Sequence, residues 1–198
     1  MISEELLITY GAEVIHLNES ELLFEENDPP WYYFQIKTGQ VKLVNYNSSN
    51  GEFIQSIHEQ GESVGEVFLF CKHHRYPATA VIMKDAEILR LRRSRFLELL
   101  ESDSNLLLEF LKVCAERTYH SYTFLYSHTS ADATQRLIKI LDHLKKKEDG
   151  TEPFTYLVPY TRKELSSMTG LRIETVIRIL KKLQQKKIVK IIRRKVCY

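Results

Sequence analysis

The chain has 198 residues, of which 43% are apolar and 27% charged, with a formal net charge of +2. This composition is typical of a globular protein of one or two domains and argues against a disordered chain. No apolar stretch approaches the roughly 20 residues that cross a bilayer, which argues against a membrane protein.

The three cysteines, Cys71, Cys114 and Cys197, lie far apart and show no C-x-x-C spacing. The sequence therefore encodes neither a disulfide framework nor a thiolate metal or iron–sulfur site, and we expect packed or idle thiols. The first residues, MISEELLITYG, are acidic where a signal peptide would be basic. We accordingly expect a cytoplasmic protein without a cofactor or a metal.

Charge is distributed unevenly along the chain. Residues 161–198 contain 12 Lys and Arg against two acids, a net charge of +10, which leaves −8 for residues 1–160. A basic end on an otherwise acidic protein is the distribution expected when only that end meets a polyanion. The alternative is a solvated basic tail, but apolar residues are interleaved through the basic run and argue against it.

Residues 14–91 consist of short runs rich in β-branched and aromatic residues, separated by turn signals at a spacing of roughly ten residues. The runs are EVIHL, ELLF, WYYFQIK, QVKLVNY, EFIQSIH, ATAVIM and AEILRL, and the turn signals are NDPP, TG, NSSNG, EQGES and KDAE. This pattern predicts an antiparallel sandwich or barrel, with a hairpin at NSSNG.

Helical patterns follow: a short helix over 95–100 and a long one over 104–127 that contains neither Pro nor Gly. In the long helix, residues recur at alternating four- and three-residue steps, as in the seam of a two-stranded coiled coil. They are Leu107, Leu111, Cys114, Thr118, Ser121, Leu125 and His128. The alternative is packing on the protein's own barrel. We expect both contacts, because further apolar residues lie outside the seam: Tyr119, Tyr122, Phe124 and Tyr126.

The stretch SHTSADATQ ends the long helix and indicates a boundary near residue 130. Thr129 or Ser130 is the candidate N-cap of the next helix, QRLIKILDHLKKK. KEDGTEPF is then typical of a loop, and TYLVPY of a short strand.

The basic end begins with a specific local pattern, TRKELSSMTGLRIETVIRIL. Thr161 and Glu164 form a T-x-x-E capping box, and Gly170 supplies the backbone conformation that ends one helix before another begins at an angle. Apolar residues fall where a helix-turn-helix buries them, with a small Ser166 where the two helices touch. The buried set is Leu165, Leu171, Val176 and Ile179. An ordinary αα-hairpin is the alternative.

On the second helix of this pair, Glu174 and Arg178 are four residues apart and share one face. A carboxylate accepts from cytosine N4 and a guanidinium donates to guanine O6 and N7, so the pair fits one or two G·C pairs in the major groove. The alternative is a plain ion pair on a solvated helix. IVKIIRRKVCY then predicts a two-stranded wing around a basic turn. The surrounding lysines add phosphate-directed charge: Lys181, Lys182, Lys186, Lys187 and Lys190.

Taken together, these features resemble the Crp/Fnr family of bacterial transcription regulators, named after the catabolite activator protein. YYFQIKTGQVKLV, with its turn glycine Gly39, is similar to the family's barrel strands, and the helix-turn-helix stretch matches almost position by position. The resemblance implies an α+β fold: a cyclic-nucleotide-binding-type β-barrel (a double-stranded β-helix or jelly roll), a long dimerisation helix and a winged helix-turn-helix. We assign these parts to residues 1–103, 104–130 and 131–198.

By this resemblance Glu174 and Arg178 read bases and Thr175 contacts a phosphate. Arg172 and Ile173 stand where the family has a hydroxyl cap and an arginine, so we expect Arg172 on a phosphate in place of the first base contact. Ile177 stands where many members carry Ser or Gly and is expected to meet a thymine methyl. The expected DNA contacts are Arg162, Arg172, Ile173, Glu174, Thr175, Ile177, Arg178, Lys187, Arg193 and Arg194.

GESVGEVFLF is similar to the family's phosphate cassette, with Gly65 and Glu66 where cyclic-AMP-binding members hold phosphate and ribose. The arginine that pairs with the cyclic phosphate falls on Tyr76, the next hydroxyl residue falls on Pro77, and Arg75 is one position off. The N-terminal cysteine cluster of iron–sulfur members is missing. The pocket candidates are Gly65, Glu66, Val67, Arg75, Tyr76, Pro77, Ser121 and Tyr122.

The resemblance implies a homodimer on double-stranded DNA, with RNA polymerase and an unknown small-molecule effector as further partners and no membrane. We expect the effector not to be cyclic AMP. Two alternatives differ in class: a regulator with no effector, controlled by its abundance or by a partner protein, and a cupin-type barrel enzyme. The adjacent His73 and His74 lack the His-x-His spacing of a metal ligand pair, which argues against the enzyme.

Overall fold

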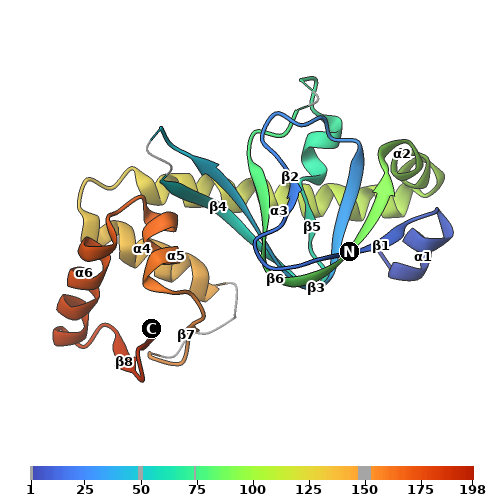
Figure 1. Cartoon of the computed structure of the whole chain (residues 1–198). Coiled ribbons are helices and arrows are strands. Elements are labelled where there is room, and N and C mark those ends of the chain that lie inside the picture. The colour runs from blue at the N-terminus through green and yellow to red at the C-terminus, as the bar shows by residue number, and fades with distance from the viewer. Residues whose placement is uncertain (1, 49–50, 74, 147–152) are drawn as a thin grey trace. The chain divides into compact units, whose positions relative to one another are not determined.

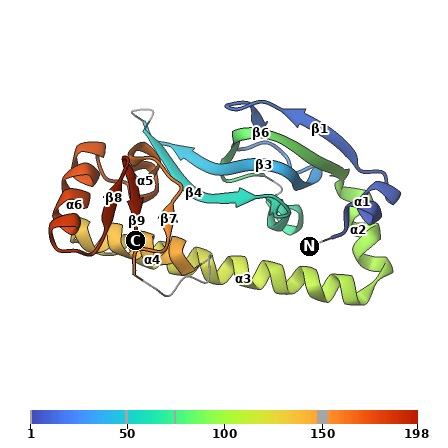
Figure 2. The same ribbon diagram turned by 90° about the horizontal axis from the view of Figure 1, so that it is seen from below.

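The computed structural model describes residues 2–48, 51–73, 75–146 and 153–198, which form two compact units, residues 1–117 and 118–198. Figure 1 shows the elements along the chain. Helix α3 (Ser104–His128) runs from the first unit into the second and is unbroken, as Figure 2 shows.

In the described part of the first unit, six strands form one antiparallel sheet in the order β1-β6-β3-β4, with β2 paired to β6 and β5 to β3. The strands are β1 (Glu13–Leu17), β2 (Leu22–Phe24), β3 (Tyr32–Tyr46), β4 (Glu52–Glu59), β5 (Ser63–Val64) and β6 (Thr79–Arg92). The same unit also contains three short helices, α1 (Glu4–Thr9), η1 (Glu66–Phe70) and α2 (Arg93–Ser102). The antiparallel sheet expected from the spacing of the apolar runs is thus confirmed, and β3 and β6 lie side by side along most of their length (Figure 1).

Two predicted turns are wrong, because TG lies inside β3 and KDAE inside β6. Gly39 has φ +94°, and a Cβ there would lie 2.5 Å from the carbonyl oxygen of Asp85 on β6. The pairing of β3 with β6 shifts register between Ile36 and Val41, so the glycine forms a bulge that bends the strand without reversing it. The β3–β4 hairpin is confirmed, with Tyr46 opposite Glu52. Residues 49 and 50 of its turn lie outside the described residues.

The sheet separates two apolar clusters, because neighbouring residues of a strand point to opposite faces. Phe34 and Ile36 enter one cluster together with Phe24 and Tyr76. The other cluster contains Tyr33 and, from the helices, Phe96, Leu99, Leu100 and Phe110. Tyr76 belongs to the first cluster and Phe68 packs against it, whereas Leu69 belongs to the second cluster.

Helix α3 packs on the second cluster through Phe110, with Leu106 and Cys114 beside it. Packing on the protein's own sheet domain is therefore confirmed. Cys114 was expected in the outward seam, but it lies on the inward side of the helix. Leu107 and Leu111 of the same seam are exposed.

The second unit contains α4 (Ala133–Lys146), α5 (Arg162–Thr169), α6 (Ile173–Gln185) and, in its described part, a three-stranded sheet in the order β7-β9-β8. Its strands are β7 (Leu157–Val158), β8 (Lys190–Ile192) and β9 (Lys195–Cys197). The predicted strand at TYLVPY is confirmed as β7. Of the predicted KEDGTEPF loop, residues 147–152 lie outside the described residues.

The N-cap expected at Thr129 or Ser130 is wrong, since Asp132 Oδ1 accepts the Thr134 amide at 2.7 Å and caps α4. His128 was expected in the outward seam of α3. Its Nε2 instead lies 2.8 Å from the Met168 carbonyl oxygen of α5. The end of α3 is thereby joined to the helix-turn-helix.

The capping box at the start of α5 is confirmed. The Thr161 amide donates to Glu164 Oε2 at 2.6 Å, and the Glu164 amide donates to Thr161 Oγ1 at 3.2 Å. Gly170 ends the helix with φ +65°, and no atom lies within 4 Å of the position that a Cβ would take. Backbone conformation alone therefore requires glycine there. Leu165, Val176 and Ile179 are buried as expected, and Leu171 is half-buried.

Candidate nucleic-acid interface and effector pocket

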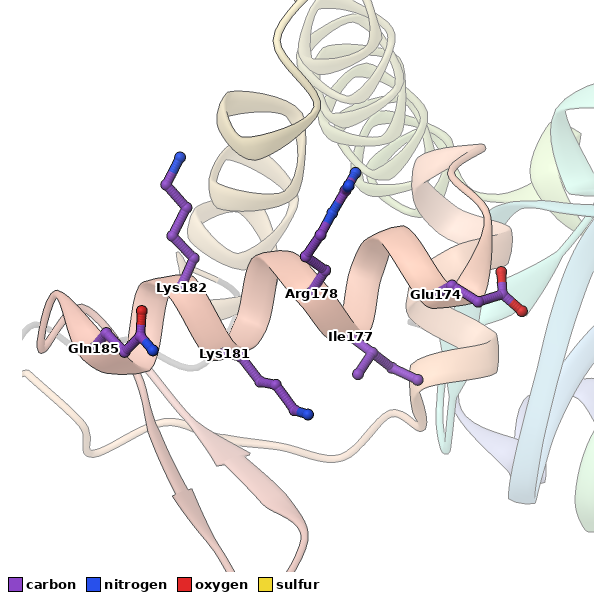
Figure 3. Close-up of a pocket in the computed structure, with 6 residues that line it drawn as sticks. All are labelled: Glu174, Ile177, Arg178, Lys181, Lys182 and Gln185. Carbon is purple, nitrogen blue, oxygen red and sulfur yellow. The ribbon is translucent and has the colours of Figure 1, made fainter.

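Helix α6 has one buried and one exposed face. Val176, Ile179, Leu180 and Leu183 are buried and fix the orientation of the helix. The other face lines a shallow surface concavity of about 490 Å³, shown in Figure 3. Its six residues are Glu174, Ile177, Arg178, Lys181, Lys182 and Gln185. Arg178, Lys181 and Lys182 outnumber Glu174, so the concavity carries a net positive charge that suits an anionic ligand.

Glu174 and Arg178 are exposed and line this concavity, and Figure 3 shows that their charged groups point in different directions. Among the ion pairs between described residues, none joins Glu174 to Arg178. The alternative of a plain i,i+4 ion pair therefore has no geometric support. Both charged groups are available to an external partner.

The start of α6 differs from the rest of the face. Arg172 is the N-cap residue, with extended backbone and no side-chain capping bond, and its side chain is exposed. Ile173 and Thr175 are half-buried in the first turn. Exposed amides at a helix N-terminus and a nearby guanidinium are suited to an anion.

The wing is a hairpin of β8 and β9. Arg193 and Arg194 form its turn with φ +47° and +65°, a conformation that few residues other than glycine adopt. The Arg162 guanidinium, at the start of α5, donates to the Arg194 carbonyl oxygen. This bond places three arginines together at one end of the helix-turn-helix. Lys187 lies exposed after the end of α6, with φ +56°.

The ten predicted DNA contacts thus all lie in the second unit, on or directly beside α5, α6 and the wing. Seven of them are exposed, and Arg162, Ile173 and Thr175 are half-buried.

Side chains of the domain itself lie against Gly65, one of the predicted pocket residues. The buried ring of Tyr76 stacks on Phe24, with centroids 3.6 Å apart and an interplanar angle of 11°. Gly65 faces this stack: its φ is +70°, and a Cβ there would lie 2.9 Å from Tyr76 Cε1. Burial is the main cause that raises the pKa of Tyr76, with the charges of Asp28 and Glu66 adding to it. The ring stays neutral near pH 7.

Glu66 is buried at the start of η1, and both of its carboxylate oxygens lie 2.6 Å from Nη1 of Arg117. This ion pair was not predicted, because Arg117 is 51 residues away and is typical of a charged surface position on a long helix. The pair joins the cassette segment to α3. Burial, and after it the Glu66 charge, raises the pKa of the nearby Cys114 thiol, while the Arg117 charge opposes the shift.

The remaining pocket candidates are spread out. Arg75 is exposed and donates to the Asn27 carbonyl oxygen at 2.6 Å, so it does not point into the pocket. Pro77 is exposed, and its carbonyl oxygen accepts from Asn45 Nδ2 at 2.8 Å. Val67 is half-buried on η1, whereas Ser121 and Tyr122 are exposed on the part of α3 that belongs to the second unit.

Each of the two units contains a region that matches a known protein family. The cyclic nucleotide-binding domain family matches residues 14–103, and the Crp-like helix-turn-helix domain family matches residues 135–197. The chain belongs to the Crp/Fnr family of transcription regulators. The long helix α3 lies between the two matched domains.

The similarity to individual Crp/Fnr proteins covers most of the chain. The cAMP-activated global transcriptional regulator CRP of Salmonella typhimurium is 25% identical over 173 residues, which are 87% of this chain and 82% of that protein. A c-di-GMP-responsive global regulator of Xanthomonas campestris is 21% identical, with a TM-score of 0.80 and coverage of 98% and 96%. FixK2 of Bradyrhizobium japonicum is 19% identical, with a TM-score of 0.77 and coverage of 94% and 91%. These two structures share the fold of this chain.

The Crp/Fnr family consists of transcription regulators and not of enzymes. A lysophospholipase of Chaetomium globosum also matches, over 112 residues that make up only 7% of its length.

Across the described ranges, no three His, Cys, Asp or Glu residues lie close enough to hold a metal ion. His73 is exposed, and His74 lies outside the described residues. No helix in the described ranges is long and apolar enough to cross a membrane.

Proposed function

We propose that this Crp/Fnr protein acts as a homodimer that binds a near-palindromic DNA operator in a sequence-specific manner, with one α6 helix in the major groove of each half-site. The observation that carries the proposal is the outward face of α6, where Glu174 and Arg178 are exposed and not paired with each other.

Glu174 and Arg178 supply the base contacts. The carboxylate of Glu174 accepts from cytosine N4, and the guanidinium of Arg178 donates to guanine O6 and N7. One turn of helix separates the two residues, so they reach adjacent base pairs. G·C pairs are therefore required at fixed positions in each half-site.

Five basic residues around this pair and the hydroxyl of Thr175 supply phosphate contacts, which position the protein without specifying sequence. They lie at the start of α5, at the start of α6, just after the end of α6 and on the wing. The set is Arg162, Arg172, Thr175, Lys187, Arg193 and Arg194. The net charge of +10 on residues 161–198 makes this part of the interaction strong and sensitive to salt.

Dimerisation is assigned to the outward side of α3. Leu111, Tyr122 and Leu125 are 54%, 68% and 63% exposed, on a helix whose other side already packs on the sheet domain through Phe110. When a helix has apolar residues on two sides and one side packs on its own domain, the other apolar side is expected to be buried against a partner. Two copies present two reading helices about one DNA turn, roughly 34 Å, apart, as a palindrome requires. RNA polymerase is the further partner that this role implies.

The sheet domain does not bind cyclic AMP or cyclic GMP in this proposal, because Tyr76 and Phe24 fill the space in front of Gly65. This observation favours a second candidate, a regulator without any small-molecule effector that is controlled by its own abundance or by a partner protein.

A mobility-shift experiment with purified protein and DNA from its own promoter tests the proposal. We expect a shift that unlabelled promoter DNA competes away and random DNA does not. Equal competition by random DNA would contradict sequence-specific binding. A specific shift without any additive supports the effector-free candidate, and a shift only after adding a small-molecule cell extract supports an effector.

A further inference from the structure

One edge of the reading face of α6 is apolar. Ile177 is 39% exposed, and Ile173, one turn earlier on the same side of the helix, is half-buried. In Figure 3 Ile177 projects on the side of Lys181, away from Arg178 and Lys182. The apolar part of this edge is therefore short: it consists of Ile173 and Ile177 and ends at Lys181, one turn further on.

An exposed isoleucine can form no hydrogen bond with a base edge. In the major groove, the apolar group that distinguishes one base from the others is the 5-methyl group of thymine. We infer that Ile177 contacts the 5-methyl group of a thymine in each half-site and makes that base a determinant of specificity. The inference rests on the proposed function, because it requires α6 to lie in the major groove.

The geometry of the helix also fixes the position of this thymine. Ile177 and Arg178 are consecutive residues, about 100° apart around the helix axis, so they cannot contact the same base edge. The thymine therefore lies beside the base pair that Arg178 reads, towards the apolar edge of the helix. Each half-site is therefore expected to contain a G·C pair with a thymine directly next to it.

Replacing thymine by deoxyuridine isolates this contact, because uracil keeps the hydrogen-bonding edge of thymine and lacks only the methyl group. The operator is first selected from random duplexes with the purified protein. Each thymine of one half-site is then replaced in turn, and dissociation constants are measured. At one thymine we expect about a fourfold loss of affinity, the value of one buried methyl group.

In the Ile177→Ala variant, replacing that thymine by deoxyuridine should no longer lower the affinity, and the requirement for G·C should remain. Ile188→Ala is the matched control, because Ile188 is 37% exposed in the same unit and lies beyond the end of α6. This control should preserve the thymine-to-uridine difference. Because both side chains are partly exposed, neither change should unfold the domain.

The outcomes separate the inference from the proposed function. If uridine is neutral at every position while Arg178→Ala still relaxes the G·C requirement, the methyl contact is wrong and the proposed function stands. A uridine effect that survives Ile177→Ala also overturns the inference. If selection enriches no sequence, the proposed function fails and the inference fails with it.

Discussion

The ring of Tyr76 stacks on the ring of Phe24, with centroids 3.6 Å apart, in front of Gly65. Tyr76 Oη lies 3.5 Å from the Tyr32 carbonyl oxygen, a weak contact that leaves packing as the main role of the side chain. At the position where cyclic-nucleotide-binding relatives are expected to present a guanidinium, this protein therefore has part of its apolar core.

The first prediction concerns cyclic nucleotides. A buried cyclic phosphate needs a matched positive charge, because an unpaired buried anion costs several kcal/mol. Tyr76 and Phe24 offer none, and Arg75 is bound to Asn27 on the surface. Isothermal titration calorimetry with cyclic AMP and cyclic GMP should show no binding at physiological concentrations. A micromolar dissociation constant that disappears in Glu66→Ala would restore the ordinary cyclic-nucleotide switch.

The second prediction concerns the stability of the sheet domain. Tyr76→Ala should lower the free energy of unfolding by about 3–5 kcal/mol, because it removes a buried ring and leaves a cavity beside Phe24. Tyr46→Ala is the control, since that ring is 50% exposed, and it should change stability by less than about 0.5 kcal/mol. Urea denaturation followed by circular dichroism measures both. Equal effects of the two changes would show that Tyr76 is not part of the core.

The third prediction concerns the ion pair between Glu66 and Arg117. Arg117→Met leaves the buried Glu66 carboxylate without its partner and should cost about 3–5 kcal/mol of stability. Adding Glu66→Gln removes the unpaired charge and should recover much of that loss. A double-mutant cycle by urea denaturation gives the coupling between the two residues. Additive single effects would mean that the pair does not form in solution.

The helix-turn-helix could be predicted from the sequence because its signals are local. The Thr161–Glu164 capping box and Gly170 act within a few residues, so they can be recognised without knowledge of distant contacts. The bulge at Gly39 shows the opposite case. Thr-Gly is compatible with a turn or a bulge, and the long pairing of β3 with β6 decides between them.

The sites in the sheet domain were less predictable because they depend on distant contacts. The four- and three-residue steps of α3 include Leu111 and Cys114 alike, but only packing against the sheet shows that Cys114 faces inward. The partner of Glu66 comes from 51 residues away, and no pattern in the sequence indicates it. The position of Tyr76 was identified by resemblance, whereas its stacking on Phe24 required the fold.

The fourth prediction concerns dimerisation. Replacing Leu111 and Leu125 with glutamate puts charge on the outward side of α3 and should produce monomers near 23.3 kDa that no longer bind the operator. Leu22→Glu is the control, because Leu22 is exposed on β2, and it should leave the dimer intact. Light scattering coupled to size-exclusion chromatography reports the mass. A native protein that stays at 23.3 kDa at all concentrations would contradict the dimer.

In the proposed complex Arg178 reads a base, whereas basic residues around it, Lys187 among them, contact phosphates. The most direct test compares Arg178→Ala with Lys187→Ala, which removes the same charge beyond the end of α6. Operator and random DNA are titrated with each variant over a range of salt concentrations.

Arg178→Ala should cost about 1–3 kcal/mol on the operator and relax the preference at one base pair. Lys187→Ala should weaken binding to operator and random DNA alike and reduce the salt slope by about 1. If the two variants lose affinity equally on operator and random DNA, Arg178 does not read a base and the account of α6 as the reading helix is wrong.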